Sequence, residues 1–436
     1  MLTPQTEVTD VLVIGGGQSG VAMSEHLTDR GIPHIVLERD RIAERWRSER
    51  WDSLVANGPA WHDRFPGMDF RTDPDGFATK DEIADYFVAY AEQVGAPIRE
   101  GVEVLKVTKK PNAKGFIAET TEGRIRARYI VSATGAFQQP SIPPILPEDS
   151  PITQLHSAAY RNPDQLPEGG VLVVGSGSSG VQIAAELREA GREVYLAVSP
   201  HERPPRRYRG RDFVWWLGVL GMWDAPTPAR GAEHITISVS GANGGETVDF
   251  RKLAASGITL VGRAVSCEDG VMSFAPDLGA NIAVGDSTYL SILDGADAYI
   301  EANGLDLPED PDARVMGAEP ECVSHPVREL DLAAAGVTSI VWATGFRSDY
   351  SWLQVEAFDP QGRPVQQRGI SPVPGVYFLG LPWQSRRGST FIWGIWHDAK
   401  YLADQINIQL GYGAYRGSAR KVPRAESEAF DAAVVR

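Results

Sequence analysis

Hydrophobic positions along this chain follow two alternating patterns, short β-branched runs and longer stretches with helical periodicity. A run at residues 11–14 leads into a glycine-rich turn and a helical stretch, and the same order returns at residues 171–174. After each turn, Gly31 and Gly191 occur at equal spacing before a second β-rich run. Two such units in the same frame predict an α/β protein with two Rossmann-like, doubly wound domains.

The same periodicities predict the other elements more coarsely. Residues 80–93 have the amphipathic pattern of a helix, and further helices are expected at 288–303 and 389–410. The expected strands are 101–109, 115–121, 126–132, 337–342 and 377–380. We expect a proline-rich connector between domains at residues 140–151 and a loose tail after Gly411.

The length, net charge and apolar segments of the chain limit the classes of protein to which it can belong. A length of 436 residues suggests two or three domains, and a net charge of -15 argues against nucleic-acid or anionic-membrane partners. We expect no signal peptide before the first strand, and the apolar run at residues 213–223 is too short to cross a bilayer. A buried core helix is favoured for that run over an interfacial or tunnel-lining one. We therefore expect a cytoplasmic protein without a transmembrane segment or metal, for which a homodimer is a compatible state.

The first glycine turn has the spacing of a dinucleotide-binding site. Gly15, Gly17 and Gly20 lie between a β-branched run and a helical stretch. The first glycine permits the tight turn, the second lets a pyrophosphate approach, and the third allows close packing of helix on strand. Glu38 ends the next predicted strand, where a carboxylate accepts from ribose hydroxyls and excludes a 2′-phosphate. The turn therefore predicts FAD or NAD rather than a merely structural glycine turn.

The second glycine turn repeats the spacing without the acidic residue. It comprises Gly175, Gly177 and Gly180. Val198 stands where the first copy has its glutamate, and Ser199 follows, with Arg203, Arg206 and Arg207 shortly after. A hydroxyl and guanidinium groups suit an adenosine 2′-phosphate, which favours NADPH over NADH. The alternative is that these arginines belong to a solvated loop.

At this point the chain resembles the flavin-containing monooxygenase family, in particular its plant auxin-pathway and small bacterial members. The residues that carry the resemblance are both glycine turns, Glu44-Arg45-Trp46, Asn57-Gly58-Pro59, Ala78-Thr79-Lys80, two Ala-Thr-Gly turns (133–135 and 343–345), Gly388 and Asp398-Ala399-Lys400. The resemblance implies a glutathione-reductase-like layout with a discontinuous FAD domain. Its parts would be residues 1–150 for the first part, 151–334 for the NADPH domain with a helical insertion, and 335–436 for the second part with the C-terminal tail.

The resemblance also implies an activity. Family members are FAD-dependent monooxygenases that use NADPH and molecular oxygen and insert one oxygen atom into a small organic substrate, by N- or S-oxygenation, through a flavin C4a-hydroperoxide. The alternatives are a Baeyer–Villiger oxygenase and an NADPH oxidase that releases no oxygenated product. A disulfide-reductase-like carrier is disfavoured, because Cys267 and Cys322 are far apart in sequence and neither has a C-x-x-C partner.

Site residues follow from the same resemblance. FAD contacts are implied for Gly15, Gly17, Gln18, Ser19, Gly20, Glu38, Arg39, Trp46, Ala133, Thr134, Gly135 and Ser389. NADPH contacts are implied for Gly175, Gly177, Ser178, Ser179, Gly180, Ser199, Arg203, Arg206, Ala343, Thr344 and Gly345. The helix after Gly388 is expected to direct its N-terminus toward the flavin and stabilise negative charge there.

Three further positions are singled out. Asn57 matches the family asparagine near the flavin and the nicotinamide and is the predicted catalytic residue, the alternative being a turn residue. Trp393, Trp396 and His397 are predicted to form an aromatic substrate wall, with ordinary core packing as an equally weighted alternative. His156 matches a histidine of the family motif between the two turns and is predicted to position the linker.

Overall fold

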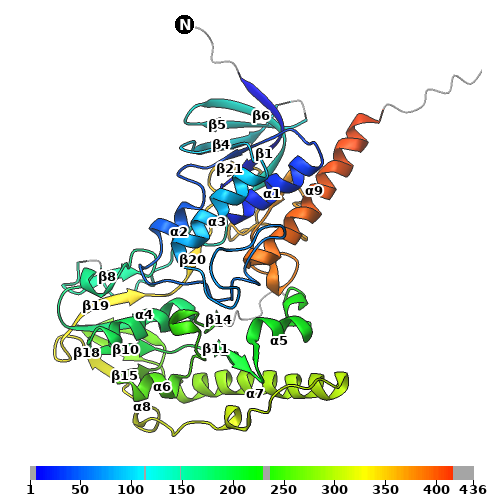
Figure 1. The fold of residues 1–436 in the computed structure, drawn as a ribbon. Coiled ribbons are helices and arrows are strands. Elements are labelled where there is room, and N and C mark those ends of the chain that lie inside the picture. Colours follow the sequence, from blue (N-terminus) through cyan, green and yellow to red (C-terminus); the bar gives the residue numbers. More distant parts are fainter. Residues whose placement is uncertain (1–5, 112–113, 148, 229–235, 416–436) are drawn as a thin grey trace, which may run out of the picture.

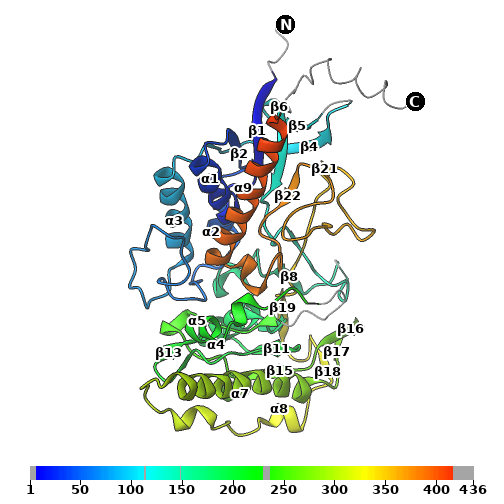
Figure 2. The same cartoon turned by 90° about the vertical axis from the view of Figure 1, so that its right-hand side faces the viewer.

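A computed structural model describes residues 6–111, 114–147, 149–228 and 236–415. Figure 1 shows two bodies, one holding the N-terminal and C-terminal helices and the other built from the middle of the chain. The perpendicular view in Figure 2 shows the same division, with α9 (Ile392–Ala414) beside the first sheet and α7 (Leu278–Asn303) at the far side of the second body. The predicted α/β class with two Rossmann-like domains is confirmed.

The first sheet is assembled from both ends of the chain. Its order is β21 (Leu353–Gln354), β4 (Val104–Lys109), β5 (Phe116–Thr120), β6 (Gly123–Ser132), β1 (Glu7–Ile14), β2 (His34–Leu37) and β3 (Ile98–Arg99), with β22 (Val376–Phe378) also paired with β6. The pairs around β1 are parallel, whereas β4, β5 and β6 form an antiparallel meander. Since β21 and β22 come from beyond residue 350, the first domain is discontinuous, as predicted.

Hydrophobic side chains on both faces of β1 explain its continuous apolar run. Val11 and Val13 pack on one face with α1 (Gln18–Asp29), α3 (Lys80–Gln93) and α9. Leu12 and Ile14 pack on the other face against the meander. A parallel strand buried on both sides requires apolar residues at every position. The short helix α2 (Glu44–Ser48) follows β2 and contacts α3.

The second sheet is parallel throughout the described residues. Its order is β15 (Ile258–Val261), β10 (Val194–Ala197), β9 (Gly170–Val174), β19 (Val337–Trp342) and β8 (Thr153–His156). Helix α4 (Ser178–Glu189) connects β9 to β10. As in the first domain, alternate residues of the central strand β9 enter different clusters, Val171 and Val173 on one face and Leu172 and Val174 on the other. Each domain therefore contains a central parallel strand that is buried on both faces.

Smaller elements extend the second domain. They are the strands β11 (His201–Glu202), β12 (Arg207–Tyr208), β13 (Arg211–Asp212), β14 (Thr236–Ile237), β16 (Ala264–Glu268), β17 (Val271–Phe274) and β18 (Glu329–Asp331), the helices α5 (Phe213–Val219), α6 (Phe250–Ala255) and α8 (Glu321–Ser324), and the 3-10 turns η1 (Pro163–Gln165), η2 (Met222–Asp224), η3 (Ala242–Gly244) and η4 (Pro311–Arg314). The apolar run at residues 213–223 becomes α5 and η2. Phe213, Trp216, Leu217 and Trp223 are buried, as a core helix requires. Phe213, Val214 and Trp223 also line a cavity, so the tunnel-lining alternative holds in part.

Two linkers, which run side by side, join the domains. The first follows the turn at residues 133–135 and contains β7 (Gln139–Pro140), and the second follows residues 343–345 and contains β20 (Phe346–Arg347). The two strands pair antiparallel, and Figure 1 shows β20 between the two bodies. The second crossing therefore lies after β19. The predicted boundary at residue 334 falls too early, because the apolar run at 337–342 pairs with β9 and β8 of the second sheet.

Most predicted elements are present, with informative differences at their ends. α3 and β19 have the predicted bounds, and a capping box between Thr79 and Glu82 begins α3. α7 begins ten residues before the expected Thr288. Its first turns contain Gly285, where a Cβ would collide with the buried His201 ring, so this glycine serves packing and hides the helical pattern. The last helix continues past Gly411 to Ala414, and the rest of the predicted tail from residue 416 lies outside the described residues.

Candidate functional site

The first glycine turn packs tightly against the Ala-Thr-Gly turn that follows β6. Gly15 has φ +110°, and a Cβ there would lie 2.6 Å from the Ala133 carbonyl oxygen. A Cβ at Gly20 would collide with the Gly15 carbonyl. Gly17 differs, since a Cβ there would meet no atom of the described residues within 4 Å. The turn therefore leaves open space only at its second glycine, beside the N-terminus of α1, where a pyrophosphate would be expected.

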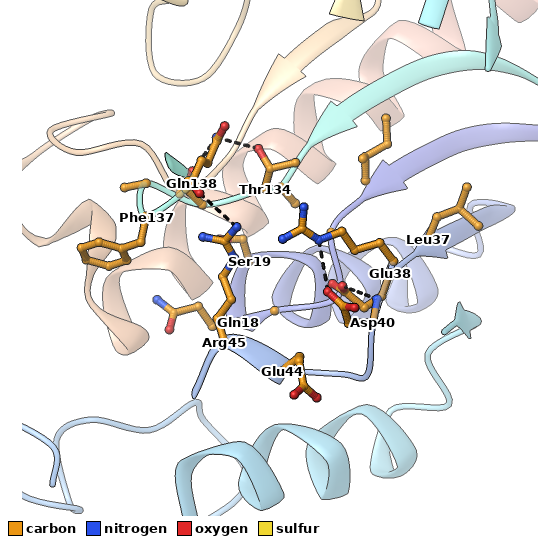
Figure 3. A pocket seen from close by; sticks show the side chains of 18 of the residues that line it. Gln18, Ser19, Leu37, Glu38, Asp40, Glu44, Arg45, Thr134, Phe137 and Gln138 are labelled. Atoms are coloured by element: carbon orange, nitrogen blue, oxygen red, sulfur yellow. Dashed lines mark hydrogen bonds and ion pairs between the residues drawn. The ribbon is translucent and has the colours of Figure 1, made fainter. Parts of the chain in front are cut away.

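A cavity of about 460 Å³ opens at this turn and is called the first cavity. Figure 3 shows its side chains, contributed by the start of α1, the end of β2, α2 and the turn at residues 134–138. It is lined by the predicted FAD residues Gly15, Gly17, Gln18, Ser19, Glu38, Arg39, Trp46, Ala133, Thr134 and Gly135. Gly20 and Ser389 do not line it. Ser389 is buried in the 3-10 turn η5 (Arg387–Thr390), where its hydroxyl accepts from the Ser385 amide at 3.1 Å.

Glu38 is fixed at the edge of the first cavity by backbone groups. Its Oε2 accepts from the Gly16 amide at 2.6 Å and its Oε1 from the Asp40 amide at 3.0 Å. Each carboxylate oxygen has a second lone pair, so the group can still accept from ligand hydroxyls. The neighbouring Arg39 pairs with Asp40 at 3.1 Å on the surface. The geometry fits an adenosine ribose at Glu38, as FAD requires.

The second glycine turn has the same backbone conformation as the first, but another part of the chain covers the space above it. Gly175 has φ +112°, and a Cβ there would lie 2.5 Å from the Ala343 carbonyl oxygen. A Cβ at Gly177 would lie 2.7 Å from the Thr236 hydroxyl, and Ser178 Oγ donates to the Ile237 carbonyl at 2.9 Å. The chain's own strand β14 therefore lies above the second turn, where the first turn has open space.

A second cavity, also of about 460 Å³, reaches this turn. Of the predicted NADPH residues, Gly177, Ser178, Ser179, Ala343 and Gly345 line it. Gly175, Gly180, Thr344 and Ser199 do not line it. The Ser199 amide donates to Ser176 Oγ at 2.9 Å, which ties the end of β10 to the turn. The glycines and the helix N-terminus fit a dinucleotide that enters from the cavity side, with Thr236 and Ile237 as the opposite wall.

Arg203 is not brought to the second cavity. It is 2% exposed, donates to Asp286 Oδ1 at 2.6 Å, and lies over the Tyr289 ring at 4.5 Å. Its charge is thus already compensated within the domain. Sequence reasoning missed this because Asp286 is remote in the chain.

Arg206 is also absent from the lining of the cavity and contacts the Asn57 segment instead. It is 3% exposed and forms a bidentate ion pair with Asp212, with N–O distances down to 2.6 Å. Its Nη1 donates to the Asn57 carbonyl at 2.6 Å, and its guanidinium lies over the Phe77 and Phe213 rings. Arg206 therefore joins the second domain to the first.

Asn57 lines the second cavity, and its side chain is oriented from the other domain. Its Oδ1 accepts from Gln182 Nε2 at 2.9 Å, and Gln182 also donates to the Val239 carbonyl at 2.8 Å. An isolated bridge between Val55 and Thr79 holds the segment next to the start of α3. Because Oδ1 is occupied, Asn57 Nδ2 is the group left to donate into the cavity.

The two cavities share one wall. Trp46, Arg50, Ala136, Phe137 and Thr390 line both of them. The two nucleotide turns that the sequence predicts separately therefore open into neighbouring cavities that have five lining residues in common.

Comparisons with known proteins identify relatives of this chain. The model of the pyridine nucleotide-disulphide oxidoreductase family matches residues 12–212. A CzcO-like oxidoreductase of Geobacillus kaustophilus is 37% identical over 92% of this chain and 98% of its own length. The indole-3-pyruvate monooxygenase YUCCA1 of Oryza sativa is 26% identical over 93% of each chain. A flavin-containing monooxygenase from Stenotrophomonas maltophilia has the same fold, with a TM-score of 0.64 and 20% identity over 93% of this chain and 100% of its own.

The chain belongs to the flavin-containing monooxygenase family. It is an oxidoreductase, and family membership implies flavin-dependent monooxygenase activity and a flavin cofactor. Cys267 and Cys322 of this flavin monooxygenase are free, burial raises the pKa of both thiols, and neither lines a cavity. The described residues contain no helix long and apolar enough to cross a membrane. Nor do they contain a cluster of three or more residues suited to a metal.

Arg50 is a site residue of this flavin monooxygenase that sequence reasoning missed. It is half-buried in the wall that both cavities share, with its guanidinium 5.4 Å from the Trp46 and Phe137 ring centres, and burial lowers its pKa to about 10. Within the described ranges it has no ion pair with a carboxylate. A desolvated cation at a cavity wall is suited to an anionic ligand. The sequence feature that could have pointed to Arg50 is the cluster of arginines around Trp46.

The predicted aromatic wall on α9 is only partly near the site. Trp396 faces α1, where its Nε1 donates to Glu25 Oε2 at 2.7 Å and its ring contacts His26. His397 is exposed, with edge-on ring contacts to both tryptophans of the helix, and neither it nor Trp396 lines either cavity. Trp393 lies behind the wall, in ring contact with Trp223, which does line the second cavity. Although they are three residues apart on α9, the rings of Trp393 and Trp396 contact different neighbours, Trp223 and His26.

His156, at the end of β8, anchors the start of the second linker. Its Nε2 donates to the Gly345 carbonyl at 2.9 Å, and its Nδ1 accepts from the Ala158 amide at 3.1 Å. Burial lowers the pKa of His156, so the ring stays neutral. This geometry supports a linker-positioning role.

The open space at Gly17 allows FAD binding at the first turn to be tested separately from the stability of the protein. Gly17→Ala should fold with wild-type stability but lose most of its FAD, because the new methyl group occupies only the space that a pyrophosphate needs. FAD content is measured from the flavin absorbance per protein, and stability by urea unfolding. Gly15→Ala should instead destabilise the apoprotein, owing to its positive φ and the Ala133 carbonyl. Gly411→Ala, which also enters open space but on α9, is the matched control. Full flavin content in Gly17→Ala would reject the assignment.

Proposed function

We propose that this chain is an FAD-dependent monooxygenase that uses NADPH and molecular oxygen to insert one oxygen atom into a small organic substrate, by N- or S-oxygenation. The observation that carries the proposal is the shared wall of the two cavities, because it brings the cavity at each nucleotide turn next to the other. When bound, FAD would accept a hydride from NADPH and activate oxygen. The chain's own residues bind, orient and exclude water.

The first cavity would hold FAD. Gly17 and the N-terminus of α1 would face the pyrophosphate, and Glu38 would accept from the adenosine ribose. Gln18 Nε2 donates to the Thr390 carbonyl at 3.2 Å, which links the start of α1 to the segment before α9. Arg50 would offer its uncompensated charge at the wall that both cavities share.

NADPH would enter the second cavity at the N-terminus of α4. Val198 and Ser199 stand where an NADH site would carry a carboxylate, and a carboxylate would repel a 2′-phosphate. Since Arg203 and Arg206 are paired with Asp286 and Asp212, the phosphate contact is assigned to Arg207, which is exposed on β12.

Asn57 would act where the two cofactors meet the substrate. Gln182 and Arg206 fix its amide and its carbonyl, so little reorganisation is needed when Nδ2 donates to a bound group. An amide donates a hydrogen bond without giving up a proton, which suits a site that must hold a reactive oxygen species until substrate arrives. Cytoplasmic localisation and a homodimeric state stay predictions.

The proposed function is tested by following the oxygen atoms. FAD-loaded protein is supplied with NADPH and ¹⁸O₂ together with methyl phenyl sulfide, N,N-dimethylbenzylamine or cyclohexanone. We expect ¹⁸O in the sulfoxide or the N-oxide, with NADPH consumed in proportion. A labelled lactone from cyclohexanone alone would show a Baeyer–Villiger oxygenase. Hydrogen peroxide in full yield with no labelled product would show an NADPH oxidase.

If Arg207 and not Arg203 contacts the 2′-phosphate, substitution of Arg203 should change the stability of the protein, and substitution of Arg207 should change its coenzyme preference. Arg203→Gln removes one of the two arginines that pair with Asp286, the other being Arg251 at 2.8 Å, and should lower the free energy of unfolding by about 1–3 kcal/mol, with equal effects on NADPH and NADH. Arg207→Gln should leave stability within about 0.5 kcal/mol and raise the KM for NADPH alone by roughly tenfold or more. Urea unfolding and steady-state kinetics with both coenzymes measure this. A selective NADPH defect in Arg203→Gln would contradict it.

The role of Asn57 predicts uncoupling. Asn57→Leu keeps a similar volume, removes both hydrogen-bonding functions, and leaves both glycine turns intact. FAD content and the rate of flavin reduction by NADPH should stay near wild type, while the fraction of NADPH that yields hydrogen peroxide should rise severalfold. Asn407→Leu, on an exposed face of α9, is the control for the substitution itself. Unchanged coupling in Asn57→Leu would leave Asn57 as a turn residue.

A further inference from the structure

A histidine and a carboxylate lie at the wall of the second cavity, just after the Asn57 segment. His62 and Asp63 both line that cavity, and their side chains are 12% and 13% exposed. His62 Nδ1 lies 2.8 Å from Asp63 Oδ1, and Asp63 Oδ2 accepts from the Gly58 amide at 3.1 Å. Gly58 follows Asn57 directly, so the pair is fixed to the segment that carries the predicted catalytic amide.

The hydrogen bonds define which nitrogen carries the proton. A carboxylate only accepts, so Nδ1 of the neutral ring is the protonated nitrogen and Nε2 has a free lone pair. Among the described residues, Nε2 has no hydrogen-bond partner. A carboxylate that orients an imidazole through Nδ1 and leaves Nε2 toward a reactant is the arrangement of a general base.

Aromatic rings surround the imidazole and define what it can meet. Trp223 stacks on His62 at 5.7 Å, and Trp393 and Trp61 contact it edge-on at 5.4 Å each. Indole faces beside a carboxylate attract cations. Two charged groups of the same cavity, Glu202 and Arg387, neutralise each other across the domains. Asp63 is the carboxylate in contact with His62, and Arg206, the nearby cation, is itself in a bidentate ion pair with Asp212.

We propose that His62, oriented by Asp63, is the general base that deprotonates a protonated amine substrate in the second cavity. The inference rests on the proposed monooxygenase function and selects amines within it. An alkylammonium has no lone pair with which to accept oxygen, and at neutral pH most tertiary alkylamines are in that form. His62 Nε2 takes the N–H proton, and the freed electron pair forms the N–O bond.

The step balances without another reactant. Ammonium, NADPH and O₂ give the N-oxide, NADP⁺ and water. Two electrons from NADPH reduce one oxygen atom to water, and the other atom is transferred to nitrogen. The hydride hydrogen and the proton removed by His62 become the two hydrogens of that water. The base therefore passes on a proton that the overall reaction consumes.

The kinetic test compares two amines of similar shape. N,N-Dimethylbenzylamine is protonated at pH 7 and N,N-dimethylaniline is not. In FAD-loaded His62→Gln, the ratio of kcat/KM for the benzylamine to kcat/KM for the aniline should fall about a hundredfold, the usual contribution of general-base catalysis. Asp63→Asn should lower the same ratio, because it reverses the orienting hydrogen bond. The exposed His325→Gln is the matched control and should leave the ratio unchanged. An unchanged ratio, with both amines affected equally, would show that His62 only packs the cavity.

A second measurement does not depend on turnover, so it separates failure of this inference from failure of the proposed function. Ring ¹⁵N signals of FAD-loaded protein are recorded, and those of His62 are assigned by their absence in His62→Gln. We expect Nε2 to be the non-protonated nitrogen and to shift when dimethylbenzylammonium is added. Benzyltrimethylammonium, which has no N–H, should leave the Nε2 signal nearly unchanged. A protonated Nε2, or no difference between the two cations, would overturn the assignment.

Discussion

The position of the cavity-lining loop depends on one buried guanidinium. Arg206 pairs with Asp212 of its own domain and donates to the carbonyls of Ser240 and, in the other domain, Asn57. Burial lowers the pKa of Arg206, and its carboxylate partner offsets this effect. Removing one partner of such a pair would leave an uncompensated charge in the interior. Asn57, Gly58, His62 and Asp63 all belong to the segment that this cation holds in place.

Two glycines make that contact sterically possible. A Cβ at Gly241 would collide with the Ala56 carbonyl, and a Cβ at Gly245 would lie 2.7 Å from the Phe77 ring and 2.9 Å from Arg206 Cδ. Both glycines belong to the second domain, and both allow close approach to the Asn57 loop or to Arg206. In sequence they resemble an ordinary surface turn. Their spacing instead reflects close contact between the two domains.

The sequence predicts what depends on local pattern. The runs beginning at Val11 and Val171 are continuous because their strands are buried on both faces, and the amphipathic stretch 80–93 forms a helix of the predicted length. Contacts between distant residues were not predictable in this way. Arg203 found its carboxylate in α7, and Trp396 packed on α1 rather than on the cavity. The base His62 was missed because only the fold places it beside Trp223 and Trp393.

The paired linkers set a mechanical limit on the enzyme. A single flexible connection would let the two sheets bend and twist freely about one another. Here β7 and β20 are hydrogen-bonded to each other, and His156 adds a bond to Gly345 at the same place. Twisting one domain against the other would shear these bonds, whereas rotation about the axis of the ribbon leaves them intact. Bending at this paired ribbon is therefore the easiest relative motion of the domains, and it would change the width of the space between the two glycine turns.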